Sequence, residues 1–456
     1  MKNTTNLTTS LQTDFYQFTM AYAYLVSGIA NETTGFESFI RHIKPAVAGD
    51  NKFYIFKGEQ DIHNFMKIVK DEFSNPDFFD KFWEIFEPKF KEKDRVNEYY
   101  TIAKKAFDEM DKDFEYTVVP DGTKVYPMVP VFQFKGPKMI GQMIETPVTN
   151  IINGQTGKES FKTFFPDEFD AIEKIDKIMN GIVPPHYNVM LKERAIEYRN
   201  ATSKILLEAA FRRAPNFALA FQASMIAIEN GWDGTSNTSL YGFIAIEKIG
   251  GTMAHAFVMA FKHEIDAFKS WDAIFPGSTI LIDTYDSVNA AKMLVENNIR
   301  PVAVRIDSDP IEKLAREVRA IFDEAGWTEV KIFLSGDITP EKLIQWEKDD
   351  VPFDMCMAGT KYVNIDVMEN VNAGFVYKIV EYEEDGRRFF PYKKAFGKSN
   401  YPGLKTVTVD SEGDITMSIN GKIGFNNIKN INDNAYIEFM SRIDFSKSVE
   451  TNSIAI

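Results

Sequence analysis

Residue types that bind phosphate or take part in nucleophilic chemistry recur along the chain from about residue 211 onward. The segment Phe211-Arg212-Arg213-Ala214 places two guanidinium groups after an apolar run, and His255 ends the small-residue segment Gly251–His255. Arginine pairs with carboxylates and phosphates, and neutral imidazole is a competent nucleophile near neutral pH. Taken singly, the arginine could be a surface residue that starts a loop, and the histidine a buried core residue. Whether these residues are functional therefore depends on the helices and strands that position them.

Four apolar segments of the same region end in small or polar residues. These predicted strands are Ser278–Thr284, Pro301–Ser308, Val330–Asp337 and Phe353–Thr360. Segments of helical periodicity separate them at 287–298, 310–326 and 340–350. Repeated strand–helix units predict a parallel sheet, open or closed, whose ligand loops follow the carboxyl ends of the strands. We therefore expect the polar strand ends to meet, although each could also be only a cap or a turn.

The predicted helices begin at recognisable capping pairs. These are Asp286-Ser287, Asp309-Pro310 and Thr339-Pro340. A short polar side chain before the first turn accepts a backbone hydrogen bond, and proline suits the first helical position. We expect Asp309 to cap its helix.

The two ends of the chain differ from this region. Residues 13–155 begin with a helical pattern, continue through a charged helical stretch at 61–113 and end in a β-rich segment at 117–145. Short charged strands return after about residue 376. We predict a fold of the α/β class with three parts: an N-terminal α+β domain (1–155), an α/β barrel (156–375) and a C-terminal segment (376–456) that packs on the first domain.

Composition excludes several classes of function. The chain has 456 residues, enough for two domains, and carries 52 Lys and Arg against 66 Asp and Glu, a net charge of -14. Such a charge repels nucleic acid and anionic membrane surfaces, so we expect neither as a partner. The chain has no apolar stretch long enough to span a membrane, and the single Cys356 excludes an intrachain disulfide. A cytoplasmic protein is expected.

Three common catalytic motifs are absent from the sequence. Asn153–Ser160 has only two residues between its glycines, where a phosphate-binding P-loop has four, and is interpreted as a turn. The five histidines form no H-E-x-x-H motif, and no G-x-S-x-G segment occurs. Neither a zinc site nor a serine hydrolase is predicted.

Eight segments, taken in order, resemble the nicotinate phosphoribosyltransferase family. They are TDFYQFTMAYAY (Thr13–Tyr24), ETPVTNIINGQT (Glu145–Thr156), FRRA, GWDGTSN, GTMAHAFVMAF (Gly251–Phe261), RIDSD (Arg305–Asp309), SGD and AGT. The resemblance extends from about residue 13 to about residue 405. It implies the type II phosphoribosyltransferase fold, an irregular α/β barrel beside an α+β domain built from both chain ends. It also implies a homodimer with shared active sites.

The same resemblance implies roles for individual residues. Tyr16 corresponds to the aromatic residue that a partner subunit stacks on the pyridine ring, while Phe211, Arg212, Ser236 and Asn237 correspond to the substrate-binding residues. Nicotinamide-using relatives carry an aspartate at position 236. A neutral serine beside an arginine favours a carboxylate substrate, which an aspartate would repel. Nicotinate is therefore the expected acceptor, and phosphoribosyl pyrophosphate the donor.

The same resemblance also implies which residues act in catalysis and in phosphate binding. His255 corresponds to the histidine that ATP phosphorylates, which couples ATP hydrolysis to the transfer. Arg305 and Asp307 correspond to the residues that hold the ribose and the magnesium-bound pyrophosphate. The residues expected to cradle the 5-phosphate are Ser335, Gly336, Asp337, Gly359 and Thr360. We expect Mg²⁺ to be held mainly through substrate oxygens and not by side chains alone.

The chain departs from the family pattern in several places. RIDSDP replaces the usual RLDSGD, and Ala256 replaces the serine that usually follows the histidine. The stretches 71–113 and 158–192 resemble insertions. Lys393, Lys394, Lys398 and Lys405 could belong to a loop that reaches a phosphate or to a solvated face. Two alternatives therefore stay open: a nicotinamide-using enzyme and a catalytically silent homologue that binds a nucleotide.

Overall fold

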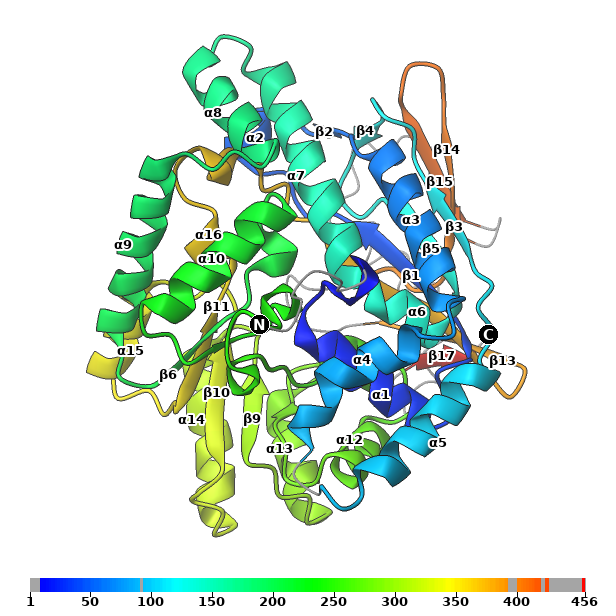
Figure 1. Ribbon diagram of the computed structural model, residues 1–456, viewed down its shortest axis with the longest axis vertical. Helices are drawn as coiled ribbons and strands as arrows, with labels where there is room; N and C mark the ends of the chain where they lie inside the picture. Colours follow the sequence, from blue (N-terminus) through cyan, green and yellow to red (C-terminus); the bar gives the residue numbers. More distant parts are fainter. Residues whose placement is uncertain (1–8, 91–92, 393–399, 420–422, 426–452, 456) are drawn as a thin grey trace.

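The structure is a computed structural model that describes residues 9–90, 93–392, 400–419, 423–425 and 453–455. For residues 418–419, 423–425 and 453–455 it describes the backbone alone. Figure 1 shows the two main groups of strands on either side of a long central helix. One continuous core of buried apolar side chains extends through both groups.

The first group is a six-stranded parallel sheet in the order β7-β6-β11-β10-β9-β8. Its strands are β6 (Ile205–Glu208), β7 (Gly234–Thr235), β8 (Ile280–Leu281), β9 (Ala303–Ile306), β10 (Lys331–Ser335) and β11 (Met355–Ala358). The helices between and after them are α10 (Phe217–Glu229), α11 (His255–Met259), α12 (Glu264–Ile274), α13 (Ser287–Glu296), α14 (Ile311–Glu324), α15 (Pro340–Lys348) and α16 (Thr360–Val363). The α/β class and its parallel sheet are confirmed. The four predicted strands each contain the observed one.

Two of the three predicted helix caps are present. The Asp286 carboxylate accepts a hydrogen bond from Asn289 N at 2.8 Å, and the Thr339 hydroxyl accepts one from Lys342 N at 3.3 Å. The prediction for Asp309 is wrong, because α14 begins at Ile311 and Pro310 occupies the cap position. Asp309 therefore lies one residue too early to accept hydrogen bonds from the first turn.

The second group is a sheet in the order β17-β13-β12-β1-β5-β3, which brings the two ends of the chain together. Its strands are β1 (Thr33–Phe39), β3 (Glu115–Val118), β5 (Phe132–Pro137), β12 (Val376–Glu384), β13 (Arg387–Pro391) and β17 (Ser453–Ala455). β1 pairs antiparallel with β5 on one side and with β12 on the other. The Glu37 carboxylate on β1 accepts a hydrogen bond from Lys405 Nζ at 2.5 Å, and both side chains are buried.

This ion pair corrects the interpretation of Lys405. The side chain neither faces solvent nor reaches toward a phosphate, because Lys405 begins β14 (Lys405–Val409) and points into the interior beneath Glu37. Lys393, Lys394 and Lys398 lie outside the described residues.

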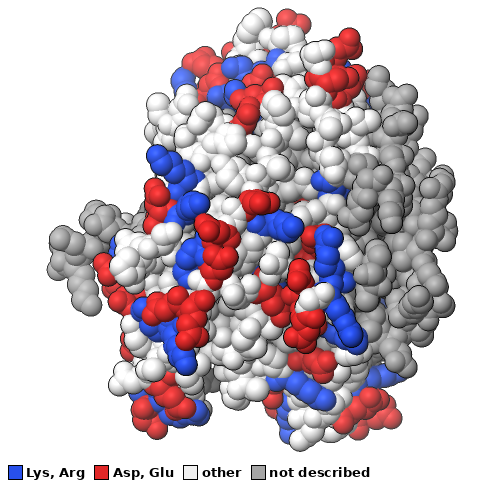
Figure 2. All heavy atoms as spheres, turned by 90° about the vertical axis from the view of Figure 1, so that its right-hand side faces the viewer, with Lys and Arg blue, Asp and Glu red and all other residues white. Residues whose placement is uncertain are grey.

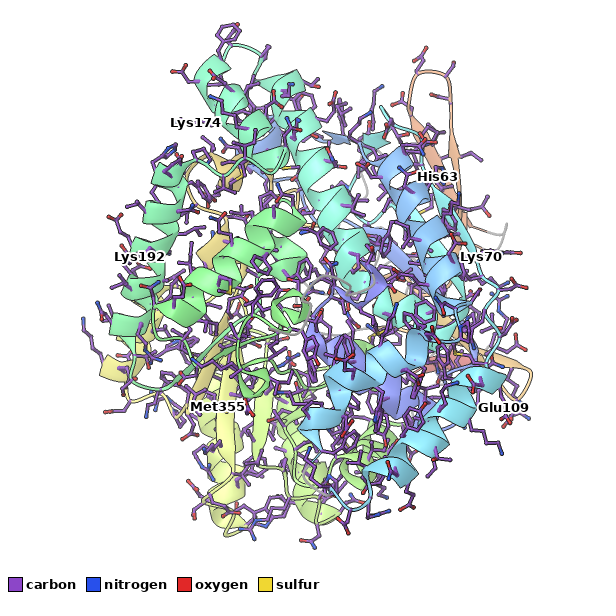
Figure 3. The ribbon with its side chains drawn as sticks, viewed as in Figure 1. His63, Lys70, Glu109, Lys174, Lys192 and Met355 are labelled. Carbon is purple, nitrogen blue, oxygen red and sulfur yellow. The ribbon has the colours of Figure 1, made fainter. Side chains whose placement is uncertain are left out.

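Helices cover the outside of this sheet. They include α1 (Phe15–Val26), α3 (Glu59–Phe73), α4 (Phe78–Phe86) and α5 (Val96–Glu109), which pack through aromatic rings such as the stacked pair Phe18–Phe82. The predicted β-rich segment 117–145 is only partly strand, since α6 (Lys138–Met143) follows β5 directly. The stretches 71–113 and 158–192 are largely helical. Lys70, Glu109, Lys174 and Lys192 lie at the outer edge of the molecule (Figure 3).

The interpretation of Asn153–Ser160 as a turn is wrong. These residues lie inside α7 (Glu145–Phe164), the central helix of Figure 1. A Cβ on Gly154 would sit 1.9 Å from Pro215 O, and one on Gly157 would sit 1.9 Å from Val371 O. The two glycines therefore let neighbouring backbone approach the helix closely, and they do not mark a turn.

The remaining elements are shorter or lie at the edge of the molecule. They are α2 (Pro45–Ala48), α8 (Phe169–Met179), α9 (Pro185–Ala201), β2 (Tyr54–Ile55), β4 (Lys124–Val125), β15 (Ile415–Ile419), β16 (Ile423–Phe425) and the 3₁₀ turns η1 (Thr9–Leu11), η2 (Glu87–Lys89), η3 (Phe211–Arg213), η4 (Thr238–Leu240), η5 (Ile246–Lys248) and η6 (Asp366–Val371). Within the described part of the chain, no helix combines the length and apolar character needed to cross a membrane. On the face shown in Figure 2, basic and acidic side chains are interspersed.

Candidate active site

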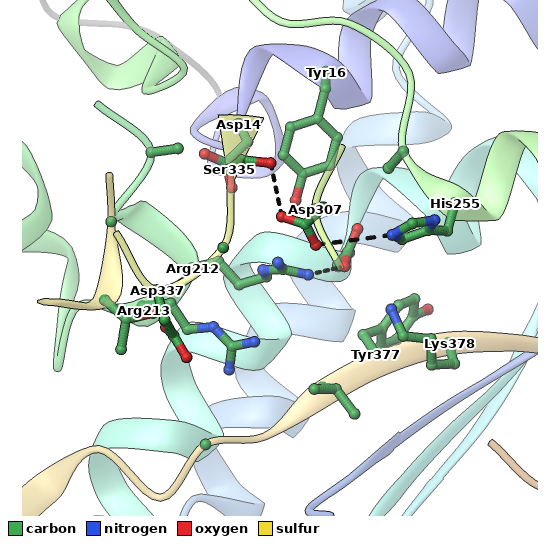
Figure 4. A pocket seen from close by; sticks show the side chains of 18 of the residues that line it. Asp14, Tyr16, Arg212, Arg213, His255, Asp307, Ser335, Asp337, Tyr377 and Lys378 are labelled. Atoms are coloured by element: carbon green, nitrogen blue, oxygen red, sulfur yellow. Dashed lines mark hydrogen bonds and ion pairs between the residues drawn. The ribbon is translucent and has the colours of Figure 1, made fainter. Parts of the chain in front are cut away.

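A cavity of about 380 Å³ opens where the carboxyl ends of the parallel strands face α1 and β12. Most of the residues singled out in the sequence line it. They are Tyr16, Arg212, His255, Arg305, Asp307, Ser335, Gly336, Asp337, Gly359 and Thr360. Phe211, Ser236 and Asn237 lie outside its lining. The fold thus brings together side chains from positions 16 to 360, several of which are drawn in Figure 4.

Arg212 is fixed by a buried carboxylate. Its Nη1 donates to Glu145 Oε1 at 2.6 Å, and the other oxygen of Glu145 accepts a hydrogen bond from Gln17 Nε2 at 2.8 Å. The turn that carries Arg212, η3, is held by Asn150, whose amide donates to Phe211 O at 3.0 Å and to Ala214 O at 2.7 Å. Arg212 is therefore positioned by α7 through both its side chain and its backbone.

Tyr16 lines the cavity of its own chain, and the expectation that a partner subunit's Tyr16 stacks on the pyridine ring stays a prediction. The segment just before Tyr16 is held in place by Asp14. The Asp14 carboxylate accepts hydrogen bonds from Ser236 Oγ at 2.5 Å and from Thr146 Oγ1 at 2.6 Å. Burial raises the pKa of Asp14, and these two hydrogen bonds oppose the rise. The Ser236 hydroxyl is thus directed to Asp14.

The side chains of Asn237 and Phe211 contact other residues inside the protein. The Asn237 side chain accepts a hydrogen bond from Ser239 N at 3.0 Å and donates to Ser224 Oγ at 3.1 Å, both inside the protein. The Phe211 ring packs edge-on against Phe217, with centroids 5.1 Å apart. Their predicted contact with substrate stays a prediction.

His255 stands at the first position of α11 and faces two carboxylates. Its Nδ1 lies 3.1 Å from Thr284 Oγ1, while its Nε2 lies 3.9 Å from both Asp283 Oδ1 and Asp307 Oδ2. One ligand atom from each of His255, Asp283 and Asp307 lies within 4.8 Å of the others. Carboxylate oxygens are the ligands that Mg²⁺ prefers, so Asp283 and Asp307 fit this ion better than the histidine does.

The strand ends after β9, β10 and β11 form one side of the cavity. Ser335 Oγ donates to Asp307 Oδ1 at 2.8 Å, and Gly336 has a φ of 102°, which a side chain rarely adopts. A Cβ on Gly359 would lie 2.4 Å from Ala209 O. Arg305 is buried at the cavity wall, and its Nε has no hydrogen-bond partner among the described residues.

Basic side chains from the N-terminal part complete this end of the cavity. Burial and the neighbouring Arg213 lower the pKa of Arg41 to about 9, and the same two causes lower the pKa of Lys44 to about 8. Burial and then Arg212 lower the pKa of Arg213 to about 10. Buried cations that lie this close to other guanidinium groups favour a polyanionic occupant.

Several cavity residues were missed in the sequence. Asp14, Arg41, Lys44 and Glu145 come from the first 150 residues. Asp283, which lies beside His255 but not in the cavity lining, was noticed only as a strand end. Asp14 and Glu145 lie inside two of the eight segments that resemble the family, so that resemblance was the signal available. For Arg41 and Lys44 no local pattern pointed to the cavity, because they lie in the loop between β1 and α2, which tertiary packing brings to it.

Sequence comparisons connect this cavity with known enzymes. Residues 11–153 match the family model for the N-terminal domain of nicotinate phosphoribosyltransferase. A nicotinate phosphoribosyltransferase of Bacillus subtilis is 27% identical over 408 residues, covering 87% of this chain and 72% of the relative. One from Mycobacterium tuberculosis is 26% identical over 409 residues, covering 87% of this chain and 75% of the relative.

Solved structures show a similar fold. The crystal structure of a nicotinate phosphoribosyltransferase from Porphyromonas gingivalis superposes with a TM-score of 0.59 at 16% identity, covering 87% of this chain and 96% of that one. A nicotinate phosphoribosyltransferase from Vibrio cholerae gives a TM-score of 0.58 at 15% identity, covering 86% and 89%. At these identities the likeness concerns the fold alone.

Proposed function

Because the chain belongs to the nicotinate phosphoribosyltransferase family, we propose that it transfers the 5-phosphoribosyl group of phosphoribosyl pyrophosphate to nicotinate. The products are nicotinate mononucleotide and pyrophosphate, in the biosynthesis of NAD. The observation that carries this proposal is the single cavity in which Arg212, His255, Asp307 and the glycine turn at Gly336 converge. These side chains lie far apart in the sequence, and one phosphorylated sugar can contact them together.

The reaction demands positioning and charge stabilisation more than covalent chemistry from the protein. The pyridine nitrogen attacks C1 of the ribose as the bond to pyrophosphate breaks, and the electron pair leaves with the pyrophosphate oxygen. The turns at Gly336 and Gly359 would hold the 5-phosphate through backbone N–H groups. Arg305 has an unused donor at its Nε, which suits a phosphate or ribose oxygen.

Mg²⁺ is the expected cofactor, and the carboxylates of Asp307, in the cavity lining, and of Asp283, just behind it, fit this ion. Asp283 and Asp307 would hold the ion together with substrate oxygens. Side chains would then supply more of its ligands than the sequence suggested. When bound, the ion neutralises charge that develops on the departing pyrophosphate. The Ser335 hydroxyl fixes the orientation of Asp307 for this role.

ATP is the expected co-substrate, with His255 as the residue that becomes phosphorylated. The Nδ1 atom faces Thr284, so Nε2 is the nitrogen directed toward the acidic side of the cavity. The imidazole would attack the γ-phosphorus of ATP, ADP would leave, and water would later release phosphate. We further propose that the enzyme acts in the cytoplasm as a homodimer.

The choice between acid and amide rests on a small number of charges. Arg212 favours nicotinate, whose carboxylate its guanidinium can pair with although Glu145 already accepts from its Nη1. Asp14 favours the runner-up, nicotinamide, because a carboxylate held beside Ser236 could accept a hydrogen bond from an amide group. We expect the acid, because Arg212 reaches the cavity directly and Asp14 is already satisfied by two hydroxyls.

The proposal is tested by incubating the protein with phosphoribosyl pyrophosphate, Mg²⁺, ATP and either nicotinate or nicotinamide. We expect mononucleotide from the acid in large excess over the amide. Arg212→Met should abolish the reaction, while Arg300→Met, at an exposed arginine paired with Glu329, should leave it intact. Preferential turnover of the amide would overturn the substrate assignment. No turnover of either would indicate a silent homologue that only binds nucleotide.

A further inference from the structure

The helix α9 carries two tyrosines that are completely buried. Tyr187 and Tyr198 are each 0% exposed. The Tyr198 ring lies 5.3 Å from that of Trp232 and 6.1 Å, edge-on, from that of Tyr362, measured between centroids. A buried phenol normally bonds its hydroxyl to a partner, because an unpaired polar group is costly away from water. The atoms that accept these two hydroxyl protons therefore show what α9 holds in place.

The Tyr198 hydroxyl holds the turn between β10 and α15. It donates to Ile338 O at 2.7 Å. This turn contains two successive residues with positive φ, Gly336 at 102° and Asp337 at 43°. Because Asp337 has a side chain, the conformation is disfavoured and persists only where neighbouring groups fix it. The bond from Tyr198 to the very next residue is one such restraint, and the helix cap at Thr339 is another.

The Tyr187 hydroxyl holds the turn that follows the neighbouring strand β11. It donates to Val363 O at 3.0 Å and to Ile365 O at 3.3 Å, so one proton is shared between two carbonyl groups. Val363 ends α16, the short helix that begins at Thr360 directly after Gly359. Burial raises the pKa of both tyrosines of α9, so each hydroxyl remains a hydrogen-bond donor.

The body of α9 lies against the helices that follow the two turns. It packs on α15 and on α16, and the strand after it, β6, pairs with β11. Tyr187 belongs to the stretch 158–192, which departs from the family pattern and to which the sequence assigned no role. One helix is thus hydrogen-bonded to both turns proposed to hold a phosphate.

From these contacts we propose that Tyr187 and Tyr198 are positioning residues for the 5-phosphate of the donor. Their hydroxyls hold the turns at Gly359 and Gly336 in the conformation that presents backbone N–H groups to the phosphate. Neither tyrosine lines the cavity, so both act through the turns. The identity of the ligand rests on the proposed function, whereas the attachment of the turns to α9 does not. The proposed partner of nicotinate is Arg212, so the two hydroxyls should affect the donor and not the acceptor.

The attachment is tested first, without substrate, by hydrogen exchange of the backbone amides. We expect Tyr198→Phe, which keeps the ring and removes the hydroxyl, to speed exchange at residues 336–339 by about fivefold and to leave residues 360–365 unchanged. Tyr187→Phe should do the reverse. Tyr24→Phe is the matched control, because it removes another buried hydroxyl, one with no hydrogen-bond partner among the described residues. Unchanged exchange at both turns would overturn the proposal.

Phosphate binding is then measured by calorimetric titration with ribose 5-phosphate. Each variant should bind this ligand about fivefold to tenfold more weakly than the wild type, which corresponds to the loss of one hydrogen bond. In steady-state assays the KM for phosphoribosyl pyrophosphate should rise by a similar factor, while kcat and the KM for nicotinate stay within about twofold. A fall in kcat alone, or an equal rise in both KM values, would indicate a general loss of structure and contradict the proposal.

Failure of this proposal and failure of the proposed function give different results. If the wild type converts nicotinate and both variants bind ribose 5-phosphate as the wild type does, the proposal is wrong and the transferase assignment stands. If the wild type shows no turnover but the variants bind ribose 5-phosphate more weakly, the tyrosines position a phosphate site and only the proposed function is refuted. Should Tyr198→Phe fail to fold, as judged by circular dichroism, Tyr187→Phe decides the outcome, because its turn is a separate one.

Discussion

Glu208 is a buried residue that sets the geometry of the cavity without lining it. Its Oε2 accepts hydrogen bonds from Ser224 Oγ at 2.7 Å and Thr235 Oγ1 at 2.5 Å, and its Oε1 accepts one from Ala210 N at 2.5 Å. The carboxylate thus ties the turn that carries Arg212 to the strand before Ser236. Burial nevertheless raises the pKa of Glu208 to about 7.

This raised pKa predicts a specific dependence of stability on pH. The folded state holds the Glu208 proton more tightly than the unfolded state, so the stabilising contribution is present below about pH 4.5 and is lost as pH rises through about 7. We expect the free energy of unfolding of the wild type to fall relative to Glu208→Gln over that window, by at most about 3 kcal/mol. Urea titrations at pH 5 and pH 8 measure it. Glu229→Gln, at an exposed position of α10, should show no such trend.

His255 supports a second prediction, which separates transfer from ATP coupling. We expect His255→Asn to retain basal transfer but to lose both stimulation by ATP and the labelled phosphoenzyme, because the accepting nitrogen is gone. Labelling with γ-³²P ATP and rate measurements with and without ATP test this. His63→Asn, an exposed histidine next to Tyr116, is the matched control. Unchanged labelling of His255→Asn would mean that another residue accepts the phosphoryl group.

The helix α7 organises most of the cavity through one face. Glu145 holds Arg212, Thr146 holds Asp14, Asn150 holds the turn of Phe211, and Asn153 Oδ1 accepts a hydrogen bond from Gly374 N at 2.6 Å. Side chains at these spacings point to neighbouring sides of a helix. A displacement of α7 would therefore move all four of these partners at once.

The close approach at Gly157 makes this helix sensitive to a single methyl group. Alanine favours a helix over glycine by about 1 kcal/mol, yet at position 157 its Cβ would meet Val371 O at 1.9 Å. Overpacking of this kind costs about 1–3 kcal/mol, and a rigid backbone partner favours the upper end. We expect Gly157→Ala to lower the melting temperature and the activity together. Gly250→Ala, where no atom lies within 4 Å of the added Cβ, should be neutral; an equal loss there would refute the explanation.

The sequence predicted elements with strong local signals and missed those defined by tertiary contacts. The strands at 303–306 and 331–335 and the caps at Asp286 and Thr339 followed from periodicity and side-chain chemistry that act within a few residues. The helical state of 153–160 did not, because polar residues and glycines there are buried by neighbours distant in sequence. Asp307 and Gly336 were found because parallel strands align their ends. Arg41 and Lys44 were not, since they lie in the loop that follows β1 of the other sheet.

The pairing of Glu37 with Lys405 joins the N-terminal and C-terminal parts of the chain across the whole molecule. Both side chains are almost fully buried, and Gln133 Nε2 also donates to Glu37 Oε1 at 2.8 Å. Removing one partner of a buried ion pair leaves an uncompensated charge and costs about 3–5 kcal/mol. The pair therefore matters for the attachment of the C-terminal strands, although a neutral replacement of both residues can be tolerated.

We expect Lys405→Met to destabilise the protein by about 3 kcal/mol or more and Glu37→Gln/Lys405→Met to regain most of that loss. Calorimetry on the two variants and the wild type provides the comparison. Lys331→Met, at an exposed position of β10, controls for removal of a lysine. A double variant as unstable as the single one would show that the cost comes from lost packing and not from an unpaired charge.

Arg41, Lys44 and Arg213 face the same cavity, and burial together with a neighbouring guanidinium group lowers the pKa of each. Burial and like-charged neighbours make these three charges costly, and a phosphorylated sugar that binds there offsets that cost. The substrate is in this sense a structural component of the folded enzyme. A cell that runs short of the phosphorylated donor would then hold a catalyst that unfolds and is degraded sooner, so that the lifetime of the enzyme follows the supply of what it consumes.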